Sequence, residues 1–186
     1  MPNAMLFGSA GARSSISRTT NLPTSTAFSL MCWWRPRAVT GSGTVPFVFF
    51  FGHLVQNSYY SFYCSSGIWG LRSQIEGGSA TTANFSTQPT VGKWHHLAVT
   101  VAGTSGDSFL GYLDGRLVAT LDCKAITPGV LGWGDIPLGA DTSYGAFCDI
   151  AGLKQYNRVL SQAEIVREMP FALPVSRVGL NSCYPI

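Results

Sequence analysis

The sequence has 186 residues, of which 46% are hydrophobic and only 11% are charged, with a formal net charge of +3. This length favours a single domain with a substantial hydrophobic core. The small and scattered positive charge excludes a nucleic-acid footprint, and the absence of any apolar run of about 18 residues excludes a predicted membrane-spanning helix.

The N-terminal part of the chain opens with a short apolar patch and a loop, Met5 to Ser17, and shows no secretory signal. The first clear strand is Phe28 to Pro36, which reads FSLMCWWRP. Because it is apolar on both faces, it indicates a strand that is covered on both sides. Its proline marks the end, since proline donates no hydrogen bond to a sheet. A second, aromatic strand is predicted over Phe47 to Leu54.

The middle of the chain predicts a series of hairpins. Asp114 and Gly115 separate two alternating apolar runs, and this pair best tolerates the positive φ angles of a type I′ turn. A second turn is predicted at Ser66 and Gly67. The predicted strands are Tyr59 to Ser65, Ile68 to Gln74, Trp94 to Val101, Phe109 to Leu113 and Arg116 to Leu121, with a weak or exposed strand within Gly77 to Gln88.

The C-terminal third predicts a loop over Thr127 to Gly134, a short strand over Ile136 to Ala140, and the last long strand within Phe147 to Val159. The sequence SQAE that begins at Ser161 is a capping box. It predicts a helix over Gln162 to Met169, which stops before a proline. We expect one domain over residues 1–169, followed by an extended, proline-containing arm over residues 170–186.

The five cysteines are an odd number without a Cys-x-x-Cys pair, so neither a zinc site nor a complete disulfide framework follows. Four lie in apolar, strand-like contexts that are typical of small buried hydrophobic residues: Cys32, Cys64, Cys123 and Cys148. The alternative is a disulfide within or between subunits, for which Cys183 in the arm is the best placed. The arm also offers three candidate docking residues, Val175, Val178 and Leu180.

Five strings in order resemble the laminin-G-like, concanavalin A-like jelly-roll superfamily over roughly Met5 to Met169. They are FSLMCWWRP from Phe28, KWHHLAVT from Lys93, YLDGRLVA from Tyr112, LGAD from Leu138 and YNRVLSQAEI from Tyr156. The resemblance implies an all-β, two-sheet antiparallel jelly-roll sandwich with one short helix near the C-terminus. It also implies a mostly non-enzymatic function in glycan binding, adhesion or particle structure.

The resemblance raises the question of calcium, because many relatives carry an acidic pair shortly before the Tyr-Asn-Arg string. At the matching positions this chain has Ala151 and Gly152, so the family's calcium site is predicted to be lost and no cofactor is expected. Calcium needs clustered oxygen ligands. Asp149 with Asp141 or Asp135 from nearby loops is the remaining weak candidate, and the alternative is that these are turn and cap residues.

Catalytic patterns are not found. A retaining glycosidase needs two carboxyl groups about 5 to 5.5 Å apart, and no pair of acidic residues has the spacing that places both on one face of a strand. Glu76 stands alone in the sequence. His95 and His96 are adjacent, so on a strand they point to opposite faces and share no metal. The family's Trp-x-His habit implies a structural role, with one ring bonded inside the sandwich.

The aromatic residues are the best functional candidates, because flat rings on a sheet face stack on sugars or on a neighbouring subunit. The alternative for each ring is core packing, which we expect for at least half of them. The candidate ligand-binding residues are Trp33, Trp34, Tyr59, Tyr60, Tyr63 and Trp69.

A typical soluble domain has about 25% charged residues, so a value of 11% favours a surface that is buried against neighbours. The alternative is a serine- and threonine-rich β surface without a partner. Our main hypothesis is a non-catalytic surface-recognition module, a structural or decorating subunit of a larger assembly such as a phage virion. Its partners would be copies of itself or other particle proteins, with no nucleic acid and no membrane insertion. The alternative is a lectin-like glycan-binding domain, and either role implies a virion or extracellular location.

Overall fold

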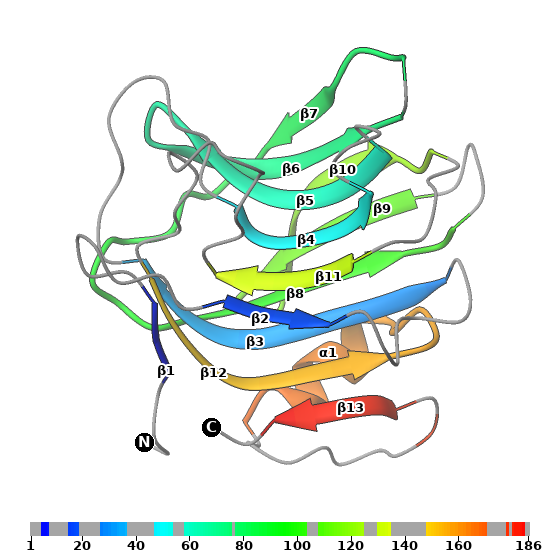
Figure 1. The fold of residues 1–186 in the computed structure, drawn as a ribbon. Coiled ribbons are helices and arrows are strands. Elements are labelled where there is room, and N and C mark those ends of the chain that lie inside the picture. The colour runs from blue at the N-terminus through cyan, green and yellow to red at the C-terminus, as the bar shows by residue number, and fades with distance from the viewer. Residues whose placement is uncertain are drawn as a thin grey trace.

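The computed structural model describes residues 5–7, 15–18, 27–36, 47–53, 58–75, 77–103, 108–124, 130–134, 148–170, 178 and 180–184. Two antiparallel β-sheets pack face to face, and one short helix, α1 (Gln162–Glu168), lies on the outside of one of them (Figure 1). The predicted fold class, an all-β two-sheet jelly-roll sandwich with one short C-terminal helix, is confirmed.

The seven-stranded sheet has the order β1-β12-β3-β8-β9-β10, and β13 also pairs with β12. Its strands are β1 (Met5–Phe7), β3 (Phe28–Pro36), β8 (His95–Val101), β9 (Ser108–Leu113), β10 (Arg116–Asp122), β12 (Cys148–Tyr156) and β13 (Leu180–Tyr184). Strands β1 and β13 share one edge of β12, so segments near both ends of the chain lie end to end along it.

The six-stranded sheet has the order β2-β11-β4-β5-β6-β7. Its strands are β2 (Ser15–Arg18), β4 (Phe47–His53), β5 (Ser58–Ser65), β6 (Ile68–Gln74), β7 (Thr81–Asn84) and β11 (Val130–Gly134). Both sheets therefore combine local hairpins with pairs of strands that are far apart in the sequence, which is the connectivity of Greek-key and jelly-roll sandwiches.

Three sequence predictions need correction. The N-terminal patch and loop contain two short strands, β1 and β2, and the loop predicted over Thr127 to Gly134 contains β11. Residues 180–184 of the predicted extended arm form β13 instead, because they pair with β12. The strand predicted over Ile136 to Ala140 lies outside the described residues.

The two predicted hairpin turns are confirmed. Asp114 and Gly115 have φ angles of 51° and 76°, and Ser66 and Gly67 have φ angles of 49° and 83°. Positive φ at both central positions is the signature of a type I′ turn, whose twist matches that of the flanking strands. These turns set the registers of β9 with β10 and of β5 with β6.

The main core lies between the sheets and follows the alternation of side chains along the strands. In β3, Phe28, Leu30, Cys32 and Trp34 point into this core, whereas Met31 belongs to a separate cluster on the other face. The prediction that this strand is covered on both sides is therefore confirmed. The four cysteines predicted to be small buried hydrophobic residues are all buried: Cys32, Cys64, Cys123 and Cys148.

The second cluster lies between α1 and the outer face of the seven-stranded sheet, and Ile165 of the helix is fully buried in it. The predicted capping box is confirmed, since the Ser161 hydroxyl accepts from the Glu164 amide and the Glu164 carboxylate accepts from the Ser161 amide at 2.8 Å. The other members of this cluster are Met31, Ala98, Tyr112, Tyr156 and Leu160. Across the described residues, the chain has no helix of the length and apolarity needed to cross a membrane.

Candidate functional site

The predicted aromatic set divides among three environments. Trp34, Tyr60 and Trp69 point into the core between the sheets, so their prediction as ligand-binding surface residues is wrong. The physical reason is strand alternation, because each of them shares the inward face with neighbours such as Phe62. Trp34 stacks edge-on against Trp69, with ring centroids 4.7 Å apart, which is a core contact.

Trp33 points the other way, to the outer face of the seven-stranded sheet, and is partly exposed. Its indole nitrogen donates a hydrogen bond to the Met169 carbonyl at 3.1 Å, and its ring packs edge-on against His96 at 5.5 Å. Trp33 therefore supports the end of the helix segment. It stands apart from the other rings of the predicted set.

Tyr59 and Tyr63 lie on the outer face of the six-stranded sheet, which is the face turned away from the other sheet. The intervening Tyr60 and Phe62 point into the core, so alternation directs Tyr59 and Tyr63 outward. Strand pairing continues this row across β6 and β7. We call this surface the tyrosine face; its residues are Tyr59, Ser61, Tyr63, Arg72, Gln74, Thr82 and Asn84.

Hydrogen bonds order the tyrosine face. The Tyr59 hydroxyl donates to the Gln74 side-chain oxygen at 2.9 Å, and the Tyr63 hydroxyl bonds the Asn84 side-chain oxygen at 3.4 Å. Tyr63 reaches Asn84 across β6 at Gly70, where the strands approach so closely that an added Cβ would lie 2.5 Å from the Ala83 carbonyl oxygen. The glycine thus lets the tyrosine span three strands.

Exposure on the tyrosine face increases toward β7. Tyr59 and Tyr63 are only 4% and 5% exposed, Arg72 and Gln74 are half-buried, and Asn84 is exposed. Buried rings do not offer open stacking surfaces, so the expected role of these two tyrosines changes. They hold the side-chain amides of Gln74 and Asn84 in place at the β6–β7 side, where Asn84 is exposed and Gln74 is half-buried.

The weak candidate metal site that remained in the sequence is not supported at Asp149. This carboxylate is fully buried and accepts from Arg35, with Nε at 2.6 Å and Nη2 at 2.5 Å from the same oxygen. Asp135 and Asp141 lie outside the described residues. Within the part of the chain that the structure describes, no group of three or more His, Cys, Asp or Glu side chains is placed to hold a metal ion.

The departure from the family's acidic pair coincides with a β-bulge in β12. The register of β12 against β3 shifts between Ala151 and Lys154, and Gly152 has a φ of 58°. A bulge with a glycine in the left-handed region bends the strand and adds one residue to one side of the ladder. The bulge also falls where the edge of β12 passes from β1 to β13.

His95 and His96 point to opposite faces, as predicted. The Thr90 amide donates to His95 Nε2 at 3.0 Å, so Nδ1 carries the hydrogen and donates to Asp114 at 2.8 Å. The other Asp114 oxygen accepts from the His96 amide at 2.8 Å. These bonds fix the Asp114 turn, and His95 Nε2 is already occupied as an acceptor, so this pair does not form an available general base.

His96 is buried on the outer face of the seven-stranded sheet, on the same side as Ala98 of the helix cluster. Burial lowers the pKa of His96 to about 4, and the nearby Lys154 charge adds to this effect, while Asp114 opposes it. Its Nδ1 atom is buried and has no hydrogen-bond partner. His96 is therefore held in its neutral form.

A buried ion pair next to this histidine was missed from the sequence. Lys154 and Glu168 are 2% and 1% exposed, with their charged atoms 3.1 Å apart, and Lys154 Nζ also donates to the Glu168 carbonyl at 2.8 Å. A cation at the C-terminal end of a helix is favourable because the last carbonyl groups lack intrahelical partners. In sequence, Lys154 is indistinguishable from a solvated surface lysine.

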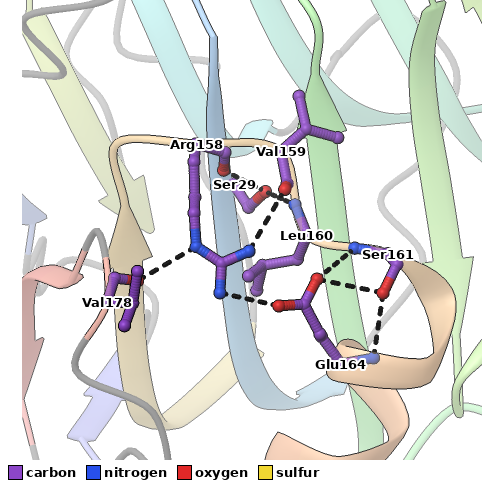
Figure 2. Close-up of polar contacts among 7 residues, drawn as sticks. All are labelled: Ser29, Arg158, Val159, Leu160, Ser161, Glu164 and Val178. Carbon is purple, nitrogen blue, oxygen red and sulfur yellow. Dashed lines mark hydrogen bonds and ion pairs between the residues drawn. The ribbon is translucent and has the colours of Figure 1, made fainter.

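Figure 2 shows a second polar network, at the beginning of α1. Arg158 pairs with Glu164 at 2.7 Å and donates to the Val178 carbonyl at 3.0 Å. Ser29 bridges β3 to the same turn, since its hydroxyl donates to the Arg158 carbonyl and accepts from the Leu160 amide, both at 2.8 Å. Arg158 thus ties the helix start to the segment that leads into β13.

The predicted assembly residues have different outcomes. Leu180 packs against the helix cluster, so it docks within its own chain. Val178 is 71% exposed. Cys183 pairs with Lys154 in the β12–β13 ladder, and its side chain and Val175 lie outside what the structure describes.

The described carboxylates are mostly engaged. Asp149, Glu164 and Glu168 pair with Arg35, Arg158 and Lys154, and Asp114 bonds His95. Glu76 is outside the described residues. Within the described residues, the polar groups of the tyrosine face are amides, hydroxyls and one guanidinium, a set suited to hydrogen bonding and not to acid–base hydrolysis.

Comparison with known proteins gives one family match. The family model described as the concanavalin A-like lectin/glucanases superfamily matches residues 8–166. A sequence comparison with curated proteins finds no significant match.

Solved structures with the same fold include a heptameric SAP-like pentraxin from Limulus polyphemus, with 16% identity and a TM-score of 0.65, covering 88% of this chain and 79% of that one. A second is the binding domain of botulinum neurotoxin serotype C1, with 18% identity and a TM-score of 0.63, covering 89% of this chain and 45% of that one. A third is a botulinum neurotoxin type C structure whose description makes cell entry dependent on two ganglioside molecules, with 18% identity, a TM-score of 0.63, and coverage of 92% and 45%. The chain thus spans less than half of the toxin domains, and at these identities the likeness shows the fold alone.

Proposed function

Because the chain belongs to the concanavalin A-like lectin/glucanases superfamily, we propose that it is a non-catalytic carbohydrate-recognition module that binds through the tyrosine face. The observation that carries this proposal is the ordered row of Tyr59 with Gln74 and Tyr63 with Asn84. Sugars are bound by fixed amide and hydroxyl groups that match the positions of their hydroxyl groups, and orientation by a buried partner reduces the entropy lost on binding.

The half-buried and exposed groups at the β6–β7 side would make the contacts, and the buried tyrosines would hold them in place. The fold neighbours give indirect support, since one of them is described as interacting with gangliosides, which carry sugar headgroups. A non-catalytic role agrees with the engagement of the described carboxylates in ion pairs and turns.

A glycan array probed with the purified protein tests the proposal. Removal of two contact groups, Gln74→Ala with Asn84→Ala, should abolish binding while the fold measured by circular dichroism is kept. Thr120→Ala, an exposed strand position on the other sheet, is the matched control and should bind as the wild type does. Absence of any bound glycan, or undiminished binding by the double variant, would contradict the proposal.

A second candidate is a structural or decorating subunit of a larger assembly such as a phage virion, with a virion or extracellular location. The observation in its favour is the charged content of 11%. The part of the predicted docking arm that forms β13 is already paired within its own sheet, which weakens this candidate. Light scattering tests it: a defined oligomer at micromolar concentration supports assembly, and a monomer that binds no particle protein refutes it.

A further inference from the structure

Arg72 differs from the other half-buried arginines whose side chains the structure describes. Arg35 pairs with Asp149, and Arg158 pairs with Glu164, each at a distance below 3 Å. Within the described residues, no carboxylate pairs with Arg72. Its guanidinium instead lies 5.9 Å from the centre of the Tyr59 ring, in a cation–π contact.

Among the described residues, the neighbours of Arg72 on the tyrosine face are uncharged. It pairs across the strands with Ser61 on one side and Thr82 on the other, and Gln74 lies two residues further along β6. The Arg72 Nε atom is buried without a hydrogen-bond partner. A half-buried cation that no described carboxylate neutralises offers a favourable contact to an oxyanion, which reaches the guanidinium through charge-assisted hydrogen bonds.

We propose that the tyrosine face selects glycans that carry an oxyanion, and that Arg72 binds this group while the neighbouring amides bind the sugar hydroxyls. This inference rests on the proposed function and names the ligand class of the same site. The shared chemistry is a negatively charged oxygen group attached to a sugar, and its two sources are the carboxylate of an acidic sugar and a sulfate ester.

The chemistry of the face supports this selection over a free anion. Arg72 alone offers one charged contact, and the half-buried Gln74 and exposed Asn84 and Thr82 add neutral donors and acceptors beside it. A free anion uses only the charged contact with Arg72, whereas an acidic glycan uses this contact and the neutral donors and acceptors. Recognition of the charge by Arg72 therefore adds to recognition of the sugar ring and does not replace it.

The test uses matched glycans on one array: neutral chains, the same chains with a terminal carboxylate-bearing sugar, and the same chains with a sulfate ester. The wild type should prefer one or both of the charged forms over the neutral form. Arg72→Gln should reduce binding of the charged form about tenfold or more, the effect of losing a charged hydrogen-bond partner, and this reduction should exceed any reduction in binding of the neutral form, so that the preference is lost. Arg72→Lys should keep part of the preference, because it keeps the charge.

Arg167→Gln on the exposed side of α1 is the matched control, since it removes the same charge from the other sheet's outer face. It should leave the preference unchanged. A readout without any variant is salt: the preference of the wild type for the charged form should fall as sodium chloride rises, because salt screens the contact.

The outcomes separate the two proposals. Equal binding of neutral and charged glycans, a preference that persists in Arg72→Gln, or a preference that is independent of salt would overturn the inference and leave carbohydrate recognition standing. Absence of binding to every glycan would overturn both. A preference for sulfate alone, or for carboxylate alone, that is lost in Arg72→Gln identifies the source of the oxyanion.

Discussion

His96 makes the stability of this protein depend on pH in a specific range. In the folded chain its pKa is lowered to about 4, first by burial and then by the Lys154 charge. In an unfolded chain a histidine has a pKa of about 6.5. Below about pH 6.5 the unfolded chain takes up a proton that the folded chain refuses, so the free energy of unfolding falls as the pH falls toward 4.

The magnitude follows from the two pKa values. From pH 7 to pH 5 this single group should lower the free energy of unfolding by about 2 kcal/mol, and the full difference below pH 4 approaches about 3 kcal/mol. An exposed histidine would contribute far less. The effect is large because the His96 side chain is only 3% exposed and its Nδ1 atom has no partner that stabilises the charged form.

The assay is urea unfolding of the wild type, His96→Gln and His95→Gln at pH 7, 6 and 5. The wild type and His95→Gln should both lose stability between pH 7 and pH 5, since both keep the buried histidine. His96→Gln should be less stable at pH 7 and should lose about 2 kcal/mol less than the wild type on acidification. Parallel pH profiles for the wild type and His96→Gln would refute the reasoning.

Three other predictions concern stability at neutral pH, each measured by urea unfolding. Lys154→Met removes the cation 3.1 Å from the buried Glu168 carboxylate and should lower the free energy of unfolding by about 3 to 5 kcal/mol, most of which should return in the double variant with Glu168→Leu. Asp114→Ala removes the acceptor of the His95 and His96 bonds and should cost about 1 to 3 kcal/mol, whereas an effect below about 0.3 kcal/mol would contradict the proposed turn. Gly152→Ala places a side chain at a φ of 58° and should cost about 1 to 2 kcal/mol, so a neutral result would argue against the bulge.

The larger part of the fold was predictable from sequence because its strands are long and its turns carry strong local signals. The hairpin at Asp114 and Gly115 needs residues that tolerate positive φ, and this requirement is visible in the sequence. Four of the short strands, β1, β2, β11 and β13, were not predicted. Strand β11 reads VLGWG, and its two glycines are typical of a loop. Strand β13 reads LNSCY, which has no alternating apolar pattern, and it follows a proline-containing segment.

The candidate site was only partly predictable because a pattern in one strand does not reveal what covers each face. Alternation alone separates Tyr59 and Tyr63 from Tyr60, yet it does not reveal that the outward tyrosines are also buried. Arg72 and Gln74 gave no signal at all, because their importance depends on strand pairing with β5 and β7. The Lys154–Glu168 pair likewise joins a strand to a helix that packs on it.

The two outer faces of the sandwich have different roles, since one contributes to stability and the other is proposed to bind glycans. This difference can be tested. On the outer face of the seven-stranded sheet, α1 covers buried side chains, and its Glu168 pairs with Lys154 close to His96. The tyrosine face lies on the opposite side of the sandwich, with the main core between them.

Residues that are far apart and share no partner usually have additive effects. His96→Gln should therefore lower stability without changing glycan preference, Arg72→Gln should change preference without changing the pH profile, and the double variant should show both effects in full. A glycan preference that changes in His96→Gln at a temperature where it is fully folded would mean that the two faces are coupled through the core.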